Sequence, residues 1–517
     1  MAQTAIWDAD GVLRSENTPY IDCIVGDLVS GKAFDFVLLF KSIGLIHEQS
    51  GDFGRKTFII SEEMRLAFGR DTLFMEEWAR LVLVCHAFPG HWEEQWFLEH
   101  GRILLPQLRH AFDFCPSMKS RVIDDPIHGY KVLLTLILST RVPGADWRLK
   151  AINIAEDILS AKPEFGNSNL IYLESLLNLR KLETSRRLQS AHFENSDDLH
   201  SPIDARSNCI HGALIRSKAQ DYIMENPSNL EEADRLLRTF GSWDPMSPST
   251  MELYEINLQK LILCKIRRWK AEFGQAVEQL DALTHFFGHN YDDTGCNFWS
   301  HYAGTLCELH RFTEAEEWSR HTIAAHQDLQ SDRIFATGQK RYRMLRLSLA
   351  ETLLSKSFVE HGFALCETEN DLVPAELEES LMIYEELNKE YQTLARRDWA
   401  SRLEHLRVVL GKAMIVHMRG LLEDAKQHWN NVLTIVQYCQ ENNQVTGFLE
   451  MVVQYCRCDI AARQEDYNEA HLFLKAAKAQ FADIGREHWW TCIGTDFLDH
   501  LRNSLAKRDM ISGIDER

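Results

Sequence analysis

Apolar and small residues recur along the chain in one short pattern. An apolar residue, any residue, and an acid or amide precede a small residue, and a bulky side chain follows four positions later in all copies but one. Positions four apart share one face of an α-helix, and a small residue allows a second helix to approach closely. The pattern therefore predicts a series of packed helices, each with the acid in its first turn. The small residues are Ala233, Ala276, Ala315, Ser380, Ala425 and Ala470, and the residues four later are Leu237, Leu280, Ser319, Tyr384, Trp429 and Leu474.

The repeated pattern resembles the second helix of a tetratricopeptide repeat (TPR), where an alanine and a phenylalanine occupy these two positions. The small residues are 43, 39, 65, 45 and 45 positions apart, more than the repeat of about 34 residues that is usual in that family. Such spacings indicate long helices and extended loops, and a segment at 359–374 accounts for the longest one. The resemblance implies an all-α fold, namely a right-handed superhelical solenoid of TPR-like helix pairs.

Residues 33–69 follow a different pattern. The apolar run 34–40 predicts a helix, and a glycine-containing turn at 49–54 separates two short segments that predict a β-hairpin ending at residue 60. The acidic sequence that begins at Ser61 predicts the start of another helix. A helix, a hairpin and a helix in this order are typical of a small winged-helix-like α/β piece.

These patterns divide the chain into five parts. A last helix over the open end of the stack is expected, because an uncovered repeat would leave apolar side chains in water. The parts are an N-terminal segment at 1–32, the winged-helix-like piece at 33–69, a helical region with degenerate repeats at 70–205, TPR-like repeats at 206–490, and a capping helix with a polar tail at 491–517.

Residues 30–115 carry a second resemblance. The Trp78-Ala79 helix, the Phe88-Pro89 pair and the Leu104-Leu105-Pro106 segment are similar to the join between winged helix and repeats in fungal NB-ARC signalling ATPases with C-terminal TPRs, which are built like NOD-like immune receptors. The family's His-Arg-Leu-Val segment is replaced here by Ser61-Glu62-Glu63-Met64. No ATPase module is found in these residues, so the resemblance implies the sensor and scaffold half of such a protein.

Composition narrows the classes of function. A formal net charge of -20, from 76 acids and 56 bases, argues against non-specific binding to nucleic acid or anionic membranes. The 12 cysteines include no CxxC pair, which is typical of reduced thiols in an intracellular protein. The sequence shows no signal peptide and no apolar run of transmembrane length. We expect a cytoplasmic protein, with the nucleus possible, and neither a membrane nor a nucleic acid as its partner.

Three short motifs mimic catalytic or ligand-binding sites. Asp8-Ala9-Asp10-Gly11 resembles the first motif of haloacid-dehalogenase-like phosphatases, but the helical remainder of the chain favours an Asp-Gly turn. Residues 26–33 match phosphate-loop spacing, except that Ala33 stands where a magnesium-binding hydroxyl belongs. His285 and His289 are four apart, but Gly288 lies between them and no HExxH glutamate is present. We expect no catalytic residue, no cofactor and no metal site.

The TPR resemblance implies where a partner would bind. In such stacks the first helix of each pair lines the concave face, and counting back from the small residues gives the inward positions. Arginine and aromatic residues are common binding hot spots, and a basic groove in an acidic protein attracts acidic segments. The candidate partner-binding residues are Lys265, Arg268, Trp269, Arg407, His417, Tyr455 and Arg463, with Met414, Met418 and Asp459 on the same faces.

The predicted function is that of a non-catalytic scaffold or adaptor for protein–protein interaction. The Lys-Asn-Lys pattern that grips a C-terminal carboxylate in some TPR proteins is not found, so the expected ligand is an internal acidic or amphipathic segment. Two alternatives remain. The chain could be a helical enzyme or biosynthetic accessory protein with a small-molecule pocket inside the superhelix, or a transcription-associated regulator. The sequence leaves the oligomeric state open.

Overall fold

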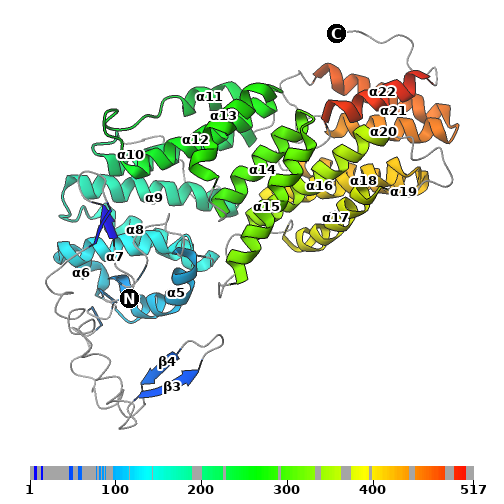
Figure 1. Ribbon diagram of the computed structural model, residues 1–517. Helices are drawn as coiled ribbons and strands as arrows, with labels where there is room; N and C mark the ends of the chain where they lie inside the picture. Colours follow the sequence, from blue (N-terminus) through cyan, green and yellow to red (C-terminus); the bar gives the residue numbers. More distant parts are fainter. Residues whose placement is uncertain are drawn as a thin grey trace. The chain divides into compact units, whose positions relative to one another are not determined.

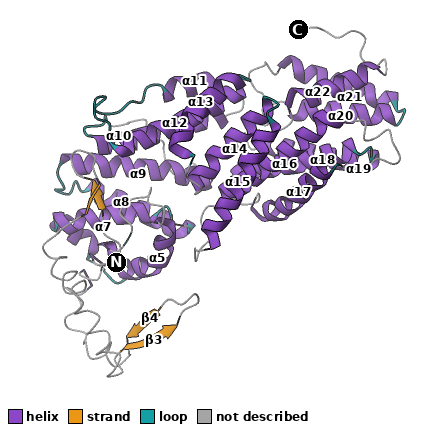
Figure 2. Ribbon diagram, viewed as in Figure 1, coloured by secondary structure: helices purple, strands orange, loops and turns teal. Residues whose placement is uncertain are grey.

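The chain is an all-α helical solenoid, in which helices that follow one another in sequence pack side by side (Figures 1 and 2). This architecture confirms the predicted fold class. The computed structural model describes residues 5–7, 13–15, 46–50, 56–60, 77–78, 81–82, 84–86, 88, 97–115, 117–142, 144–188, 201–224, 229–288, 293–331, 339–362, 374–394, 399–441, 449–483 and 494–507.

Two short hairpins precede the helices. Strand β1 (Ala5–Trp7) pairs antiparallel with β2 (Leu13–Ser15), on either side of the Asp-Gly sequence. Strand β3 (Ile46–Ser50) pairs antiparallel with β4 (Lys56–Ile60), in a register that joins Ile46 to Ile60. The second hairpin is the one predicted for the winged-helix-like piece. The helices predicted on either side of it, near 34–44 and 61–68, lie outside the described residues.

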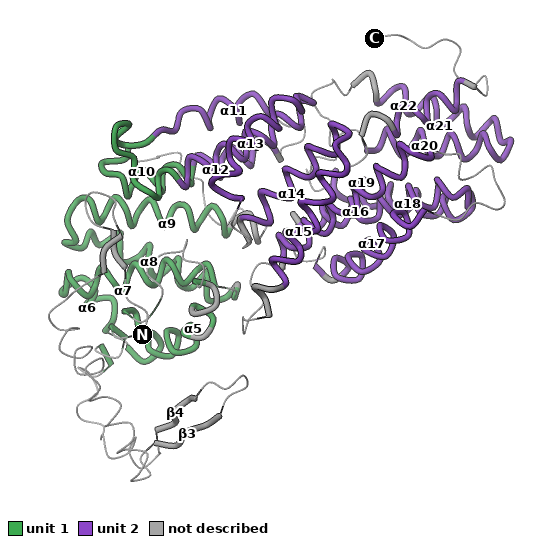
Figure 3. Tube along the Cα trace, viewed as in Figure 1, with its two compact units in different colours: residues 1–214, 242–253 green, residues 215–241, 254–517 purple. Residues whose placement is uncertain are grey.

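Contacts divide the chain into two compact units (Figure 3). Unit 1 comprises residues 1–214 and 242–253, and α7 lies at its centre. Every residue of α7 from Lys131 to Ser139 is buried, and all from Val132 to Leu138 except Thr135 are apolar; a helix segment that is apolar all round must be covered on every side. The helices of unit 1 are α5 (Phe97–Asp113), α6 (Met118–Asp124), α7 (Pro126–Ser139), α8 (Ala145–Ser160), α9 (Asn167–Leu188) and the start of α10 (Ala205–Met224).

Unit 2 comprises residues 215–241 and 254–517 and contains the repeated helix pairs. The first helices of the pairs are α12 (Thr250–Trp269), α14 (Asp293–Glu308), α16 (Gln339–His361), α18 (Trp399–Met418) and α20 (Leu449–Arg463). The second helices are α13 (Phe273–Phe287), α15 (Phe312–Ser331), α17 (Ala375–Leu394), α19 (Leu422–Glu441) and α21 (Tyr467–Asp483). The short α11 (Leu230–Leu237) precedes them, and α22 (Gly494–Lys507) follows.

The second helices confirm the repeated pattern. Each of them, and α11, begins at or within two residues of the apolar position of its copy. All six small residues are fully buried, and so are the residues four positions later, Ser319 included. A small side chain at each contact lets the neighbouring helix approach, and the bulky residue fills the space beside it. The pattern therefore located both the helices and their packing faces.

Most turns between the two helices of a pair share one backbone conformation. The second residue after a first helix has a positive φ, at Ala271, His310, Gly420 and Glu465, and the second helix begins two residues later. After α12 the Glu272 amide donates to the Arg267 carbonyl at 2.9 Å, which is the bond of a Schellman motif. The common turn gives successive pairs the same internal geometry, which a regular stack requires.

Three of the first helices, α14, α16 and α18, form an inner row in this unit. Helix α14 packs along α16, and α16 along α18. The second helices α15, α17 and α19 each pack on the first helix of their own pair and on that of the next, whereas α13 packs on α14 and α21 on α20. Helix α22 does not simply extend the order, because it packs on α20 and also reaches α16. A helix is thus present where the capping helix was expected, and it packs on the first helices α20 and α16. No described helix is long and apolar enough to cross a membrane.

Candidate functional site

Five cationic side chains from three first helices gather in one place, and we call them the cationic cluster. Lys265 and Arg268 lie in the last turns of α12, Lys340 and Arg341 in the first turn of α16, and Arg407 in the middle of α18. Each of the five is half-buried, so part of its surface remains open to solvent. The structure therefore brings together Lys265, Arg268 and Arg407, which were predicted from three separate sequence positions.

The neighbouring positive charges lower the pKa of Lys265. The pKa of its ammonium is lowered to about 8, chiefly by burial and then by the positive charges of Arg341, Arg268, Arg407 and Lys340. Burial penalises the charged form, and like charges nearby do the same. The ammonium of Lys265 also lies 5.5 Å from the centre of the Trp269 ring, a cation–π contact that offsets part of this cost.

The Arg268 side chain lies against helix α14 at Gly304. A methyl group built on Gly304 would come within 2.5 Å of Arg268 Nη2, so the absence of a side chain there makes room for the guanidinium. Arg268 Nη1 lies 3.4 Å from His301 Nδ1. The pKa of His301 is lowered well below its usual value, first by burial and then by Arg268 and Lys265, so His301 adds no positive charge at neutral pH.

Two carboxylates offset part of the positive charge. Glu351 of α16 accepts two hydrogen bonds from Arg407, from Nε at 2.9 Å and from Nη2 at 2.6 Å. Such a bidentate pair fixes the guanidinium in one orientation. Burial lowers the pKa of Arg268, and the negative charge of Glu308 of α14 acts against this by raising it. Neither Lys265 nor Arg341 forms an ion pair with any residue in the described part of the chain. The cluster thus keeps an excess of positive charge.

The remaining predicted residues lie elsewhere. Trp269 is buried among apolar side chains of α10, α11 and α12, and Tyr455 is buried in the largest core of the unit. His417 and Arg463 belong to a buried set that we call the C-terminal network. His417 on α18 and Tyr455 and Arg463 on α20 are thus covered by packing, and they are not part of the cationic cluster.

The C-terminal network is centred on Asp459 of α20. Its Oδ2 lies 3.0 Å from His417 Nε2 and accepts a hydrogen bond of 2.6 Å from Arg463 Nε, and its Oδ1 accepts one of 2.8 Å from Ser504 Oγ. The side chains of His417 and Asp459 have no exposed surface. Burial alone would raise the pKa of Asp459, but His417, Arg463 and Ser504 outweigh it and lower that pKa to about 2.

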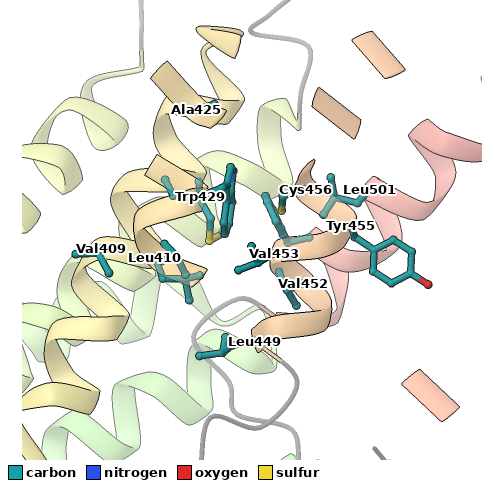
Figure 4. Packing of buried hydrophobic residues seen from close by; sticks show 14 of the residues in the cluster. Val409, Leu410, Ala425, Trp429, Leu449, Val452, Val453, Tyr455, Cys456 and Leu501 are labelled. Atoms are coloured by element: carbon teal, nitrogen blue, oxygen red, sulfur yellow. The ribbon is translucent and has the colours of Figure 1, made fainter. Parts of the chain in front are cut away.

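Helix α22 explains why these predicted positions are buried. Phe497 of α22 packs on Phe358 of α16, with 5.1 Å between the ring centres, and Ser504 contributes to the C-terminal network. Figure 4 shows Leu501 of α22 beside Cys456 of α20, and the Tyr455 ring pointing away from Trp429. The chain's own last helix therefore occupies the first-helix face of the final repeats, where a partner was expected.

Sequence analysis missed the contributions of α16 and α14 to the cationic cluster. Counting back from Ser380 fails for α16, because the long segment that precedes α17 displaces the register of that pair. A usable signal was present in the composition of α16, where Lys340, Arg341, Arg343 and Arg346 lie within seven residues. Neither Gly304 nor His301 carried a signal, because only the contact of the Arg268 side chain with α14 gives them a role.

The other motifs add no described site. The phosphate-loop-like residues 26–33 lie outside the described residues, as does His289. Within the described residues, no group of three or more His, Cys, Asp or Glu side chains could hold a metal ion. Comparisons with models of protein families, with curated proteins and with solved structures give no match. The proposals that follow rest on the residues of this chain.

Proposed function

We propose that this protein is a non-catalytic scaffold that binds an acidic segment of a partner protein at the cationic cluster. The carrying observation is that Lys265, Arg268, Lys340, Arg341 and Arg407, from the first helices α12, α16 and α18, gather in one place, in a chain whose formal net charge is -20. Charges of one sign held on rigid helices attract a ligand of the opposite sign and orient it.

Three features support this proposal. The cluster residues are half-buried, so a ligand that reaches them displaces water and strengthens each electrostatic contact. Arg407 is held in place by Glu351, which reduces the entropy lost on binding. The resemblance of residues 30–115 to a join in fungal NB-ARC/TPR proteins agrees with a scaffold role, in which the chain recruits partners and a separate protein performs the chemistry.

The test is to capture partner proteins from native extract with the unmodified chain and with two purified variants, one expected to lose the partner and one expected to keep it. Lys265→Glu/Arg341→Glu reverses two cluster charges that form no ion pair with a described residue, so no described ion pair is lost. Lys475→Glu/Lys478→Glu makes the same charge change on the exposed face of α21. Partners bound stoichiometrically by the unmodified chain are identified by mass spectrometry, then remeasured as purified proteins.

We expect the cluster variant to lose the purified partner and the α21 variant to keep it, with neither variant melting below the unmodified protein. Retention by the cluster variant at physiological salt would place the binding surface elsewhere. Loss by both variants would show that only the overall charge matters.

A further inference from the structure

The cationic cluster contains two charges that nothing described in the protein neutralises. Lys265 and Arg341 form no ion pair with a described residue, and Lys265 faces four further cations from α12, α16 and α18. Holding like charges together lowers the stability of the folded chain. A ligand that relieves this repulsion must bring concentrated negative charge to a small volume.

We propose that the cationic cluster is a phosphate-binding site, and that the acidic segment recognised by this protein carries a phosphorylated serine or threonine. This inference rests on the proposed function and narrows it. A phosphate monoester places nearly two negative charges and three acceptor oxygens on one atom. Carboxylates of a peptide carry one charge each and are spaced along its backbone.

The geometry fits such a group better than it fits separate carboxylates. Two guanidinium groups, Arg268 and Arg407, come from different helices, and guanidinium N–H groups donate strong charge-assisted hydrogen bonds to phosphate oxygens. Arg407 is oriented by Glu351, and Arg268 lies in the space that Gly304 leaves on α14. Lys265 provides a compact charge on a flexible chain, with Trp269 beneath it.

Lys265 gives the site a measurable signature. Its ammonium is close to the positive charges of Arg268 of α12, Lys340 and Arg341 of α16 and Arg407 of α18, and it acts on His301 of α14. The carboxylates of Glu308 of α14 and Glu351 of α16 act on the neighbouring Arg268. Because its pKa is lowered to about 8, part of the Lys265 population is neutral at pH 8. A bound dianion favours the charged form, so binding at that pH takes up a proton.

The probe is the peptide Gly-Ser-Gly-Ser-Gly with both serines phosphorylated, and its control is Gly-Glu-Gly-Glu-Gly. Calorimetry at pH 8 in two buffers of different ionisation enthalpy measures affinity and proton uptake together. We expect the phosphopeptide to bind at least about tenfold more tightly than the glutamate peptide. We also expect a net uptake of protons at pH 8, because the bound dianion raises the lowered pKa of Lys265.

Four variants separate the causes. Lys265→Met should weaken phosphopeptide binding about tenfold or more, whereas Lys265→Arg should bind without taking up a proton, since arginine stays charged. Gly304→Ala changes no charge, but it pushes the Arg268 guanidinium off α14 and should also weaken binding. Lys475→Met, on the exposed face of α21, should bind like the unmodified chain.

The outcomes distinguish this inference from the function beneath it. Equal affinity for the two peptides would overturn the phosphate site while leaving an acidic-segment scaffold intact. If inorganic phosphate competes as well as the phosphopeptide does, the site recognises a small phosphate ester, and the proposed segment is wrong. If neither peptide binds, the phosphate inference fails, and the capture experiment alone then decides the proposed function.

Discussion

The first helices of unit 2 were assigned one role from sequence, yet they have two different environments. From α12 to α18 the inward positions are half-buried and cationic, with Lys265 and Arg341 lacking a carboxylate among the described residues. At α18 and α20 the equivalent positions are sealed, and Asp459 there holds His417, Arg463 and Ser504. The difference lies in α22, which lies on the first helices of the final repeats. The same helical scaffold thus provides an open charged surface and a closed polar core.

The largest expected effect on stability comes from removing Asp459, the central carboxylate of the C-terminal network. We call the face of α18 and α20 that holds this network the closed end, and the face that holds the cationic cluster the open end. Asp459→Ala leaves Arg463 and His417 buried beside each other, and breaking such a pair costs about 3–5 kcal/mol. The matched change at the open end is Glu351→Ala, which frees Arg407, whose side chain is 19% exposed. Its cost should be less than half as large, about 1–2 kcal/mol. Urea unfolding of both variants measures the comparison, and equal losses would contradict it.

Removal of apolar contacts under α22 should be nearly as costly. Leu501 is fully buried against the core, and Leu501→Ala should lower the free energy of unfolding by about 3 kcal/mol. Hydrogen exchange of α20 should rise with it, because α22 covers that helix. If the variant melts like the unmodified protein and α20 stays protected, α22 is not part of the cooperative core and the closed end is not closed.

Acid should affect the closed end through Asp459. The pKa of this carboxyl is lowered from 3.8 to about 2 in the folded protein, so the unfolded chain binds the proton more readily. The stabilisation is present above about pH 4 and is lost as the pH falls towards 2, by about 2 kcal/mol in total. The difference in unfolding free energy between the unmodified chain and Asp459→Asn should shrink over that range. A difference that stays constant with pH would show that the network does not depend on charge.

The smallest expected effect is an increase in the free energy of unfolding, and it comes from removing the charge of Lys265 in the cationic cluster. Because burial and neighbouring cations lower the pKa of Lys265 to about 8, its charge opposes folding at neutral pH. Lys265→Met should therefore stabilise the protein at pH 7, by about 1 kcal/mol after allowance for solvent screening. The gain should fade as the pH rises from 8 towards 10.5, where both states lose the proton. Destabilisation at pH 7 would mean that the ammonium is paired.

The amino-acid sequence by itself determined where the helices of the repeats begin and which faces pack. An alanine or serine followed four residues later by a large side chain marks a helix contact locally, and such a contact needs only neighbouring residues to be specified. The charges of Lys265, Arg268 and Arg407 were also readable, because the count from each small residue places them on first helices.

Only the tertiary structure decided which first-helix positions stay accessible. His417, Tyr455 and Arg463 follow the same count as Lys265, yet α22 covers the face they share, and nothing local in α18 or α20 records a helix that arrives from residues 494–507. The cationic cluster likewise needed Arg341, whose helix is out of register with the other pairs, and Gly304, whose missing side chain matters only because Arg268 lies against it. Burial and electrostatic coupling depend on residues distant in sequence, so periodicity predicts the scaffold, and long-range packing determines the site.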